Sequence, residues 1–452
     1  GGTTLLGQST VSGTVTGFGS VIVDGVRIEN AAVAANKEKI DGTLELAELK
    51  LGQHVEVEHD GSLVATKVRV NAEAEGAVSA VDTTAKTITV LGQLITINTD
   101  PTLGPVTVFD GYAALANVVV GDKVEIHALI KTDATGKVTM QATRIEKKTA
   151  PNPVDLVNGN IRDLSTSAKT FRLANLLVDY GSASILPANA VLANGAEVQL
   201  ALPAGTVAGT TAVKASVIKV RDHKAEVGAK DVELGGVIST VDTATKTLTI
   251  NGAKIDVSAA VFDQAGKTFA DLKVDAYVVI KGTYTADGVL KAARVVLRGT
   301  DQKDTAAELH GTVTNFVSAA NFTVRGVKVD ATGVVLDAAS CGTSKLGSEL
   351  QVGVIGTMNA SGLVKATTIK CEKTDGALIV LSRLGTVSNV DASAKSFSLT
   401  TSKETLTMKW TSSTVFRDVE AATLAGKAVE VEGTTSAGVW TITKIVLQKP
   451  AG

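Results

Sequence analysis

Residues 241–257 read VDTATKTLTINGAKIDV, and this stretch decides the fold because close copies of it recur along the chain. Residues 81–97 read VDTTAKTITVLGQLITI, and residues 390–408 give a more diverged copy, VDASAKSFSLTTSKETLTM. In each copy a polar turn leads into an alternation of apolar residues with Thr or Ser, which is typical of a half-buried strand. Asn251-Gly252 comes next, and Asn-Gly is a preferred two-residue hairpin turn because both residues need positive φ. The stretch therefore predicts a β-hairpin that the chain uses repeatedly.

The hairpin belongs to a longer repeating unit. Each copy is preceded by a Gly that opens another alternating run, and this opening recurs at Gly13, Gly76, Gly159, Gly236, Gly311 and Gly385. After the hairpin come an irregular connection, a GxxVxV run such as residues 52–57, and a closing run such as ATKVRV at 65–70. Three strands, a connection and two more strands is the order of a small five-stranded barrel of the OB type. Closing the sheet into a barrel removes its exposed edges.

These units predict an all-β chain of six tandem small five-stranded OB-like β-barrels joined by short polar linkers. We expect an N-terminal extended segment at 1–12 and barrels at 13–73, 74–150, 151–224, 225–300, 301–376 and 377–452. Helices are expected only as short pieces in the connection after the third strand, and LELAELK from Leu44 is the best candidate. Six barrels in a row would make a long, thin and stiff molecule.

Composition and charge narrow the classes of function. The chain has 452 residues, of which 44% are apolar and only 3% aromatic, and its net charge is −2. It has no basic stripe, so general nucleic-acid binding is not expected. No apolar run reaches the roughly 18 residues that a membrane-spanning helix needs. The chain begins with Gly1-Gly2 rather than Met, which we read as processing or trimming.

Several motifs resemble a known family. GTVTGFGSVIVDGVRIE at 13–29, TVFDG at 107–111 and the closing pattern GxxVEV…ATRIE are similar to a bacterial domain, domain of unknown function 5666. Domains of that family occur in tandem in exported proteins, often lipoproteins. The resemblance covers nearly the whole chain and is weak in the unit from Gly159. It implies export and a barrel-like module, and it supplies no catalytic residues.

No residue pattern indicates catalysis, a cofactor or a metal site. The five histidines are His54, His59, His127, His223 and His310. They lack the short fixed spacings of metal ligands, and we expect them on solvated surfaces or strand edges. AGKT at 265–268 lacks the earlier Gly of a phosphate loop, and no Gly-x-Ser-x-Gly nucleophile motif occurs. We therefore expect a protein that is not an enzyme and carries no cofactor.

A few residues have expected structural roles. The Phe of a recurrent Val-Phe pair in the connection is expected in the core; it is Phe109, Phe262 and Phe416. Cys341 and Cys371 both lie in the fifth unit, where a closed barrel can bring them together. A bridge would close a loop of about 30 residues and contribute about 3 kcal/mol, whereas the alternative is two buried free thiols. Export would favour the bridge.

The leading functional hypothesis is an exported structural protein, located outside the cell or on the cell surface. Thr3, Thr4, Leu5 and Leu6 form an apolar, β-competent run that could add a strand to an open sheet edge of a neighbouring copy. A head-to-tail contact of this kind does not close, so it would build an extracellular filament in which the chain is its own partner.

The alternative hypothesis is a binding module: a periplasmic or cell-surface lipoprotein, held by a lipid anchor, that binds a polysaccharide or a protein. Trp410 and Trp440 both lie in the last unit and would serve as its ligand platform. The other units have almost no Trp or Tyr, so the binding site would be confined to the last unit.

Overall fold

The structure is a computed structural model of the chain. It describes residues 9–19, 21–29, 33–132, 135, 137–150, 152–221, 231–298, 307–372 and 381–448. The predicted assembly residues Thr3, Thr4, Leu5 and Leu6 lie outside the described residues, as does His223. We name six units by their residues: the first is 9–70, the second 74–147, the third 154–220, the fourth 232–297, the fifth 307–371 and the sixth 381–447.

The sixth unit shows the barrel in its simplest form. Its strands are β33 (Leu381–Asp391), β34 (Ser396–Thr400), β35 (Thr405–Arg417), β36 (Ala428–Ser436) and β37 (Val439–Leu447). Antiparallel pairs join β33 to β34, β34 to β35, β36 to β37 and β33 to β36, and a parallel pair joins β35 to β37. These pairings close the sheet into a barrel, and the 3-10 turn η5 (Ala421–Thr423) lies in the connection.

The fourth unit closes by the same pairings and contains the predicted hairpin. Its elements are β22 (Val232–Asp242), β23 (Thr247–Ile250), β24 (Ala253–Asp256), β25 (Val261–Phe262), η4 (Phe269–Asp271), β26 (Tyr277–Tyr284) and β27 (Leu290–Leu297). Ile250 pairs with Ala253 across the turn, and Asn251 and Gly252 have φ angles of 48° and 80°. The Asn-Gly hairpin is therefore confirmed, with the positive φ that its two turn residues require.

The second and fifth units repeat this cycle of strands. The second has β8 (Ala74–Asp82), β9 (Thr87–Val90), β10 (Gln93–Ile97), η1 (Pro101–Leu103), β11 (Val108–Asp110), η2 (Leu115–Asn117), β12 (Lys123–Thr132) and β13 (Val138–Lys147). The fifth has β28 (Ala307–Ser318), β29 (Asn321–Val324), β30 (Val327–Asp330), the short helix α2 (Ala338–Cys341), β31 (Gln351–Met358) and β32 (Val364–Cys371). In both units the irregular elements fall in the connection after the third strand.

The first and third units follow the same order with local interruptions. The first has β1 (Ser9–Phe18), β2 (Val21–Val23), β3 (Val26–Ile28), β4 (Ala35–Glu38), β5 (Leu44–Leu46), β6 (His54–His59) and β7 (Ala65–Val70). The third has β14 (Val154–Asn160), β15 (Arg162–Ser165), β16 (Thr170–Leu173), β17 (Leu176–Asp179), β18 (Ser184–Leu186), β19 (Glu197–Pro203), β20 (Val213–Lys214) and β21 (Val217–Val220). The all-β class with several closed five-stranded barrels is confirmed, while the count of six and the domain boundaries stay predictions.

One predicted local element is wrong. LELAELK does not begin a helix; Leu44–Leu46 is the strand β5, which pairs with β4. Asp41 Oδ1 accepts a hydrogen bond from the Thr43 N–H at 2.9 Å, and Gly42 has a φ of 87°, so the chain reverses at this point. The reversal places residues 44–46 beside residues 36–38, and strand pairing overrides the helix propensity of Leu, Glu and Ala.

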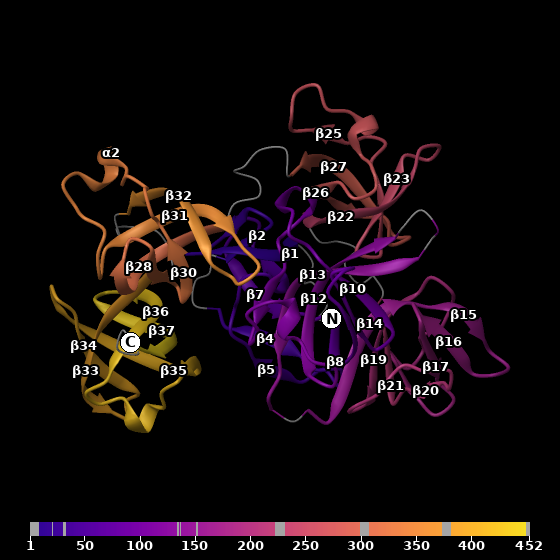
Figure 1. Cartoon of the computed structure of the whole chain (residues 1–452), viewed down its shortest axis with the longest axis horizontal. Coiled ribbons are helices and arrows are strands. Elements are labelled where there is room, and N and C mark those ends of the chain that lie inside the picture. The colour runs from indigo at the N-terminus through magenta and orange to yellow at the C-terminus, as the bar shows by residue number, and fades with distance from the viewer. Residues whose placement is uncertain are drawn as a thin grey trace.

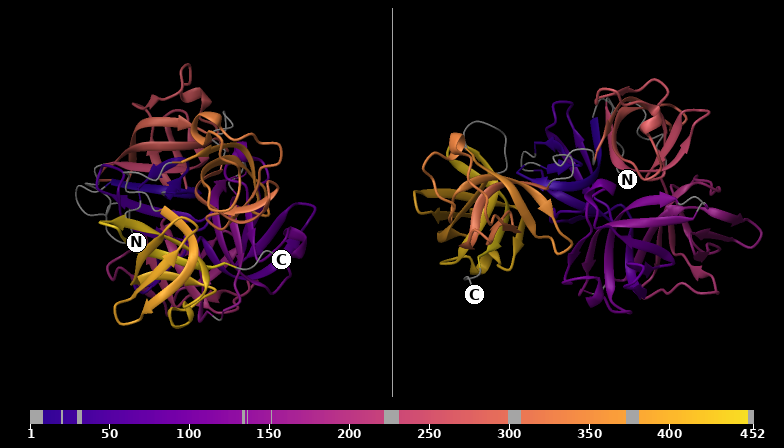
Figure 2. Two further views of the ribbon diagram at one scale, coloured as in Figure 1. Left: turned by 90° about the vertical axis from the view of Figure 1, so that its left-hand side faces the viewer. Right: turned by 45° about the horizontal axis from the view of Figure 1, so that its top comes forward.

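The units do not lie in a row. β1 pairs in parallel with β22, with Thr10 opposite Val232, and with β28, with Gly17 opposite Glu308. β8 also pairs with β14. Figures 1 and 2 show the second, third and fourth units gathered on one side, the fifth and sixth on the other, and the first where they meet. The expected thin row is thus corrected to a cluster, because strands far apart in the sequence extend one another's sheets.

Candidate functional site: an open strand edge and the cavity beside it

Strand β5 pairs with β4 on one side, and no strand of the described residues pairs with it on the other. Past the end of β5 the ladder continues with a hydrogen bond from the Ala47 N–H to the Ala35 C=O at 2.9 Å, so odd-numbered residues face β4. In an antiparallel strand, alternate residues direct their backbone groups to opposite sides. Leu44 and Leu46 therefore direct their N–H and C=O groups away from β4, along what we call the β5 edge.

The β5 edge is apolar and exposed. Leu44 is 51% exposed and Leu46 is 40% exposed, and they share one face because they are two residues apart. Proteins usually protect an edge with charged side chains, Pro or a bulge, but here the only charge is Glu45, which alternation places on the opposite face. Such an edge is a site where another strand can pair. The Leu-Glu-Leu alternation directly after Asp41-Gly42 is the sequence signal that could have found it.

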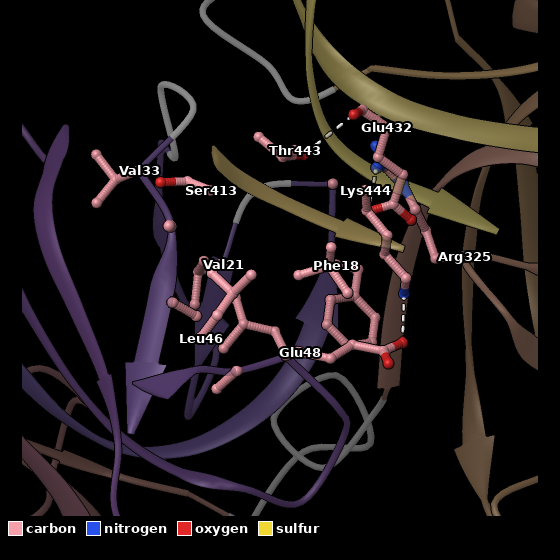
Figure 3. A pocket seen from close by; sticks show the side chains of 16 residues that line it. Phe18, Val21, Val33, Leu46, Glu48, Arg325, Ser413, Glu432, Thr443 and Lys444 are labelled. Atoms are coloured by element: carbon pink, nitrogen blue, oxygen red, sulfur yellow. Dashed lines mark hydrogen bonds and ion pairs between the residues drawn. The ribbon is translucent and has the colours of Figure 1, made fainter. Parts of the chain in front are cut away.

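A cavity of about 90 Å³ lies next to this edge, where the first, fifth and sixth units meet (Figure 3). Its apolar wall comes from the first unit and includes Phe18, Val21, Val33 and Leu46. Its polar wall comes mainly from the other two units and includes Glu48, Arg325, Ser413, Glu432, Thr443 and Lys444. Leu46 belongs to both the edge and the cavity, so the two form one site.

The first unit has a small residue where other units place a large one. In three units a Phe of the connection or of its preceding strand lies opposite an apolar residue of the closing strand; the pairs are Phe109–Ile145, Phe262–Val295 and Phe416–Ile445. In the first unit Ala35 takes this position, opposite Val68, and Ala35 lines the cavity. A methyl group fills less volume than an aromatic ring, so the wall at Ala35 leaves space for a further apolar side chain.

Ion pairs between units fix the polar wall of the cavity. Glu48 of the first unit lies 2.8 Å from Arg417 and 2.7 Å from Lys444 of the sixth unit. Arg325 of the fifth unit lies 3.5 Å from Glu432 of the sixth. Because the four charged side chains that line the cavity are mostly buried, water screens these pairs less than it screens pairs on an open surface. These ion pairs therefore hold the charged side chains of the polar wall in fixed positions.

Glu430 is an unusual carboxyl group near this wall. It is 2% exposed, and its Oε2 atom has no hydrogen-bond partner among the described residues. Burial, followed by the charge of Glu432, raises the pKa of Glu430 to about 7. Burial also acts on Glu432, but Lys444 and Arg325 outweigh it and hold the pKa of that carboxyl below its usual value. Burial therefore favours the neutral form of the Glu430 carboxyl.

A second buried polar contact joins the first unit to the fourth. Asp24 is 1% exposed; it accepts hydrogen bonds from the Tyr277 hydroxyl and, at 3.1 Å, from the Thr14 N–H. Burial raises the pKa of Asp24, and burial together with the Asp24 charge raises the pKa of Tyr277. A Cβ atom at Gly13 or Gly235 would lie 1.9 Å from Asp24 Oδ2, so both positions require glycine for this contact.

Two histidines lie at a contact between units, not on a solvated surface or a strand edge. His127 is fully buried; its Nδ1 accepts a hydrogen bond from the His54 N–H at 3.0 Å, and its Nε2 lies 2.8 Å from Glu125. His54 Nδ1 lies 2.6 Å from Glu73. These contacts join the first and second units. The prediction of solvated or edge histidines is therefore wrong for His54 and His127, because packing between units buries them.

His310 lies where the fifth unit meets the first. It forms ion pairs with Glu308 and Glu372, and a Cβ atom at Gly19 of the first unit would clash with it. Burial lowers the pKa of His310, but hydrogen bonds with Glu308 and Glu372 outweigh burial and raise this pKa to about 9. The group is therefore charged at neutral pH and holds two carboxylates together.

The structure contains the disulfide between Cys341 and Cys371 that the sequence predicted. Cys341 ends α2 and Cys371 ends β32, so the bond ties the connection to the closing strand. Phe109 is 5% exposed and belongs to the core of the second unit. Phe262 and Phe416 are half-buried and pack against the cores of the fourth and sixth units.

The two tryptophans proposed as a ligand platform lie inside the sixth unit. Trp410 is 8% exposed and Trp440 is 4% exposed, and both belong to the core of that barrel. Trp410 packs 6.1 Å from Phe397, measured between ring centroids, and the Arg383 guanidinium lies over Trp440 at 5.1 Å. A ring that packs in a core cannot stack on a ligand. The structure therefore removes the aromatic platform of the binding-module hypothesis.

Two kinds of feature do not occur within the described residues. No three side chains of the His, Cys, Asp or Glu types are grouped there so as to hold a metal ion. In the same part of the chain, no helix has both the length and the apolar character needed to cross a membrane.

One comparison with known proteins identifies a repeated domain in the chain. The family model described as Domain of unknown function (DUF5666) matches residues 75–146, 235–296 and 385–446. The chain therefore carries tandem copies of this domain, and the copies are small five-stranded barrels of OB-like order. The first unit, which holds the β5 edge, lies outside the three matched segments.

Other comparisons add little. No curated protein matches the sequence. A solved structure, drosophila Unr CSD456, is similar to part of the chain at 13% identity; the match covers 49% of this chain and 100% of that one, with a TM-score of 0.13.

Proposed function

We propose that this chain is an exported structural protein that forms an extracellular filament or surface polymer with further copies of itself. The observation that carries the proposal is the β5 edge, with Leu44 and Leu46 exposed on it. Closed barrels remove strand edges, so an apolar edge left open beside a cavity is a place for pairing with another chain. No catalytic role is proposed for the chain.

The contacts between units support a structural role. The buried Asp24 and His127 both lie at contacts between units, and their polar atoms bond within those contacts. Polar groups used in this way fix the arrangement of the barrels, which a polymer subunit needs if it is to present its edge in one orientation. The Cys341–Cys371 disulfide suits an oxidising compartment outside the cytosol and so supports export.

The experiment is a concentration series of the purified chain, observed by mass photometry and by negative-stain electron microscopy. We expect oligomers that grow with concentration and thin filaments of uniform width. A chain that stays monomeric at the highest soluble concentration would contradict the proposal. A glycan array run in parallel tests the binding-module alternative, and specific binding to a polysaccharide there would favour that alternative.

A further inference from the structure

We infer that the β5 edge and its cavity accept residues Thr3–Leu6 of a second copy of this chain, which add a strand beside Leu44 and Leu46 and insert a leucine side chain beside Ala35. The inference rests on the proposed function. It names the two surfaces that meet in the contact between copies, which we call the joint: the β5 edge with its cavity, and the segment Thr3–Leu6. It is argued from the backbone of β5, the shape of the cavity and the chain that precedes Ser9.

The backbone of β5 provides the pairing surface. Leu44 and Leu46 each present an N–H and a C=O group on the β5 edge, at the spacing that an extended segment matches. Pairing of this kind depends mainly on backbone groups, and pockets for alternate side chains add specificity. A three-residue strand spans roughly 10 Å, so a short apolar segment is enough to cover it.

The cavity provides the specificity pocket. It holds about 90 Å³ and is lined by Ala35, whose backbone register matches that of Phe109, Phe262 and Phe416 in the second, fourth and sixth units. A leucine from another chain would restore an apolar side chain at this position. The Glu48 and Lys444 charges on the rim are already paired at 2.7 Å, so an apolar side chain can enter without leaving them unpaired.

The chain that precedes Ser9 provides the segment. Residues 1–8 read GGTTLLGQ and carry no charged side chain, and Thr3-Thr4-Leu5-Leu6 is their strand-competent part. From Ser9 onward the backbone is already used, because residues 10–12 pair with β6 on one side and with β22 on the other. A strand that the N-terminal region adds to another copy therefore comes from before Ser9. Four extended residues such as Thr3–Leu6 span roughly 13 Å, which is longer than the roughly 10 Å of β5.

The two halves of this joint are different surfaces of the same chain. Such a head-to-tail contact leaves a free segment at one end and a free edge at the other, so copies continue to add and a filament results. Pairing of the segment with the β5 edge of its own chain is the competing outcome, and it would give a monomer.

The test uses two full-length variants that each remove one half of the joint. The edge variant carries Leu44→Lys and Leu46→Lys, because lysines on an exposed edge oppose strand addition. The segment variant carries Leu5→Asp and Leu6→Asp. The matched control is Val335→Lys, since Val335 is an apolar residue that is 88% exposed and belongs to neither β5 nor the cavity lining. Thermal unfolding of all variants checks that the barrels remain folded.

We expect each joint variant to be monomeric in mass photometry at concentrations where the wild type and the control form polymers. A 1:1 mixture of the two variants should give dimers and nothing longer, because only one intact edge and one intact segment remain per pair. Polymers of normal length from the edge variant, or a mixture that stays monomeric, would overturn the inference and leave the filament proposal standing.

A second measurement separates the two proposals if the wild type makes no polymers. Binding of the synthetic peptide GGTTLLGQ to the chain lacking residues 1–8 is followed by fluorescence anisotropy. We expect binding that the edge substitutions weaken at least about tenfold, which corresponds to about 1.4 kcal/mol. Peptide binding together with a monomeric wild type would mean that the segment pairs within its own chain, and would overturn exchange between copies. Absence of peptide binding would overturn the acceptor site itself.

Discussion

The connections after the third strand in the first and fourth units begin alike and end differently. In both, the first strand of the connection, β4 or β25, lies parallel to the closing strand. In the fourth unit, Thr268 then caps η4 by accepting a hydrogen bond from the Ala270 N–H at 3.3 Å, and no further strand follows before β26. In the first unit, Asp41-Gly42 turns the chain back into β5. The turn residues therefore decide whether the connection adds a second strand, such as β5, at this position of the barrel.

The same two connections differ in the side chain that faces the closing strand. Phe262 of the fourth unit packs against its core, whereas Ala35 of the first unit borders a cavity. The open edge and the unfilled core position thus occur in the same unit. An added strand needs both, since its backbone pairs with the edge and its side chain fills the space.

The largest expected effect tests the role of the connection Phe. Phe109→Ala should lower the free energy of unfolding of the second unit by about 3–5 kcal/mol, because the ring is 5% exposed. Phe262→Ala should cost less, about 1–2 kcal/mol, because its ring is only half-buried. Hydrogen exchange of each unit's own strands gives the two values separately, which a global melt of a multi-unit chain does not. A negligible cost for both would mean that the Phe is not a core residue and that Ala35 marks no missing ring.

A slightly smaller effect tests how the two compared units are joined. Gly235→Ala should destabilise the contact between the first and fourth units by about 2–3 kcal/mol, because the new methyl group collides with Asp24. Gly209→Ala is the control, since a Cβ there meets no atom within 4 Å. Differential scanning calorimetry should show the first and fourth units unfolding earlier in the Gly235 variant alone. Equal transitions in the two variants would show that Asp24 can move without loss.

A third prediction concerns pH and the contact of the first unit with the fifth. His310 has a folded pKa of about 9, above its ordinary value, so its contribution is complete below about pH 6.5 and is lost as the pH rises through 9. We expect the free energy of unfolding to fall by roughly 2 kcal/mol over that range, after allowing for the partial exposure of Glu308 and Glu372.

Urea unfolding at pH 4.5, 6, 7.5 and 9.5 measures this dependence. His310→Gln should flatten the profile between pH 6.5 and 9. Glu430→Gln should leave that alkaline part intact and change the profile only between about pH 4.5 and 7, because the raised pKa of Glu430 costs stability as the pH passes through that window. A His310 variant with the wild-type profile would place the pH dependence elsewhere.

The sequence predicts the fold well where the determinants are local. Asn251-Gly252 and the Thr-Leu-Thr-Ile alternation before it are sufficient for the hairpin, because turn geometry and period-two burial act over a few residues. For LELAELK the sequence predicts a helix because its residues have high helix propensity. The turn that precedes it instead places residues 44–46 beside β4, and this pairing makes them a strand. In the second, fourth and sixth units a Val-Phe pair identifies the position in the connection that faces the closing strand. The first unit has no such pair, so the sequence does not show that Ala35 takes this position.

The sequence does not predict the buried polar groups because their partners are distant along the chain. His127 is buried by contact with His54, which lies 73 residues away, and Asp24 by contact with Tyr277, 253 residues away. Nothing in the spacing of single residues reports which barrels touch. Burial of these groups therefore becomes visible only once strands such as β1 and β22 are seen to pair.

The smallest expected effect comes from a substitution that makes the connection of the first unit resemble that of the fourth. Ala35→Phe should place a ring where the second, fourth and sixth units have one, and should raise the free energy of unfolding of the first unit by about 0.5–1.5 kcal/mol because it occupies the cavity of about 90 Å³. Val335→Phe is the control, since it adds the same kind of ring at an exposed position. Hydrogen exchange of β7 and β4 measures the change.

If the ring fits, it also occupies the position assigned to a leucine of the next copy, so polymer formation should weaken while the β5 edge itself is unaltered. A loss of stability greater than about 1 kcal/mol would show instead that the cavity wall cannot accept the ring, and that Ala35 is not the counterpart of Phe262.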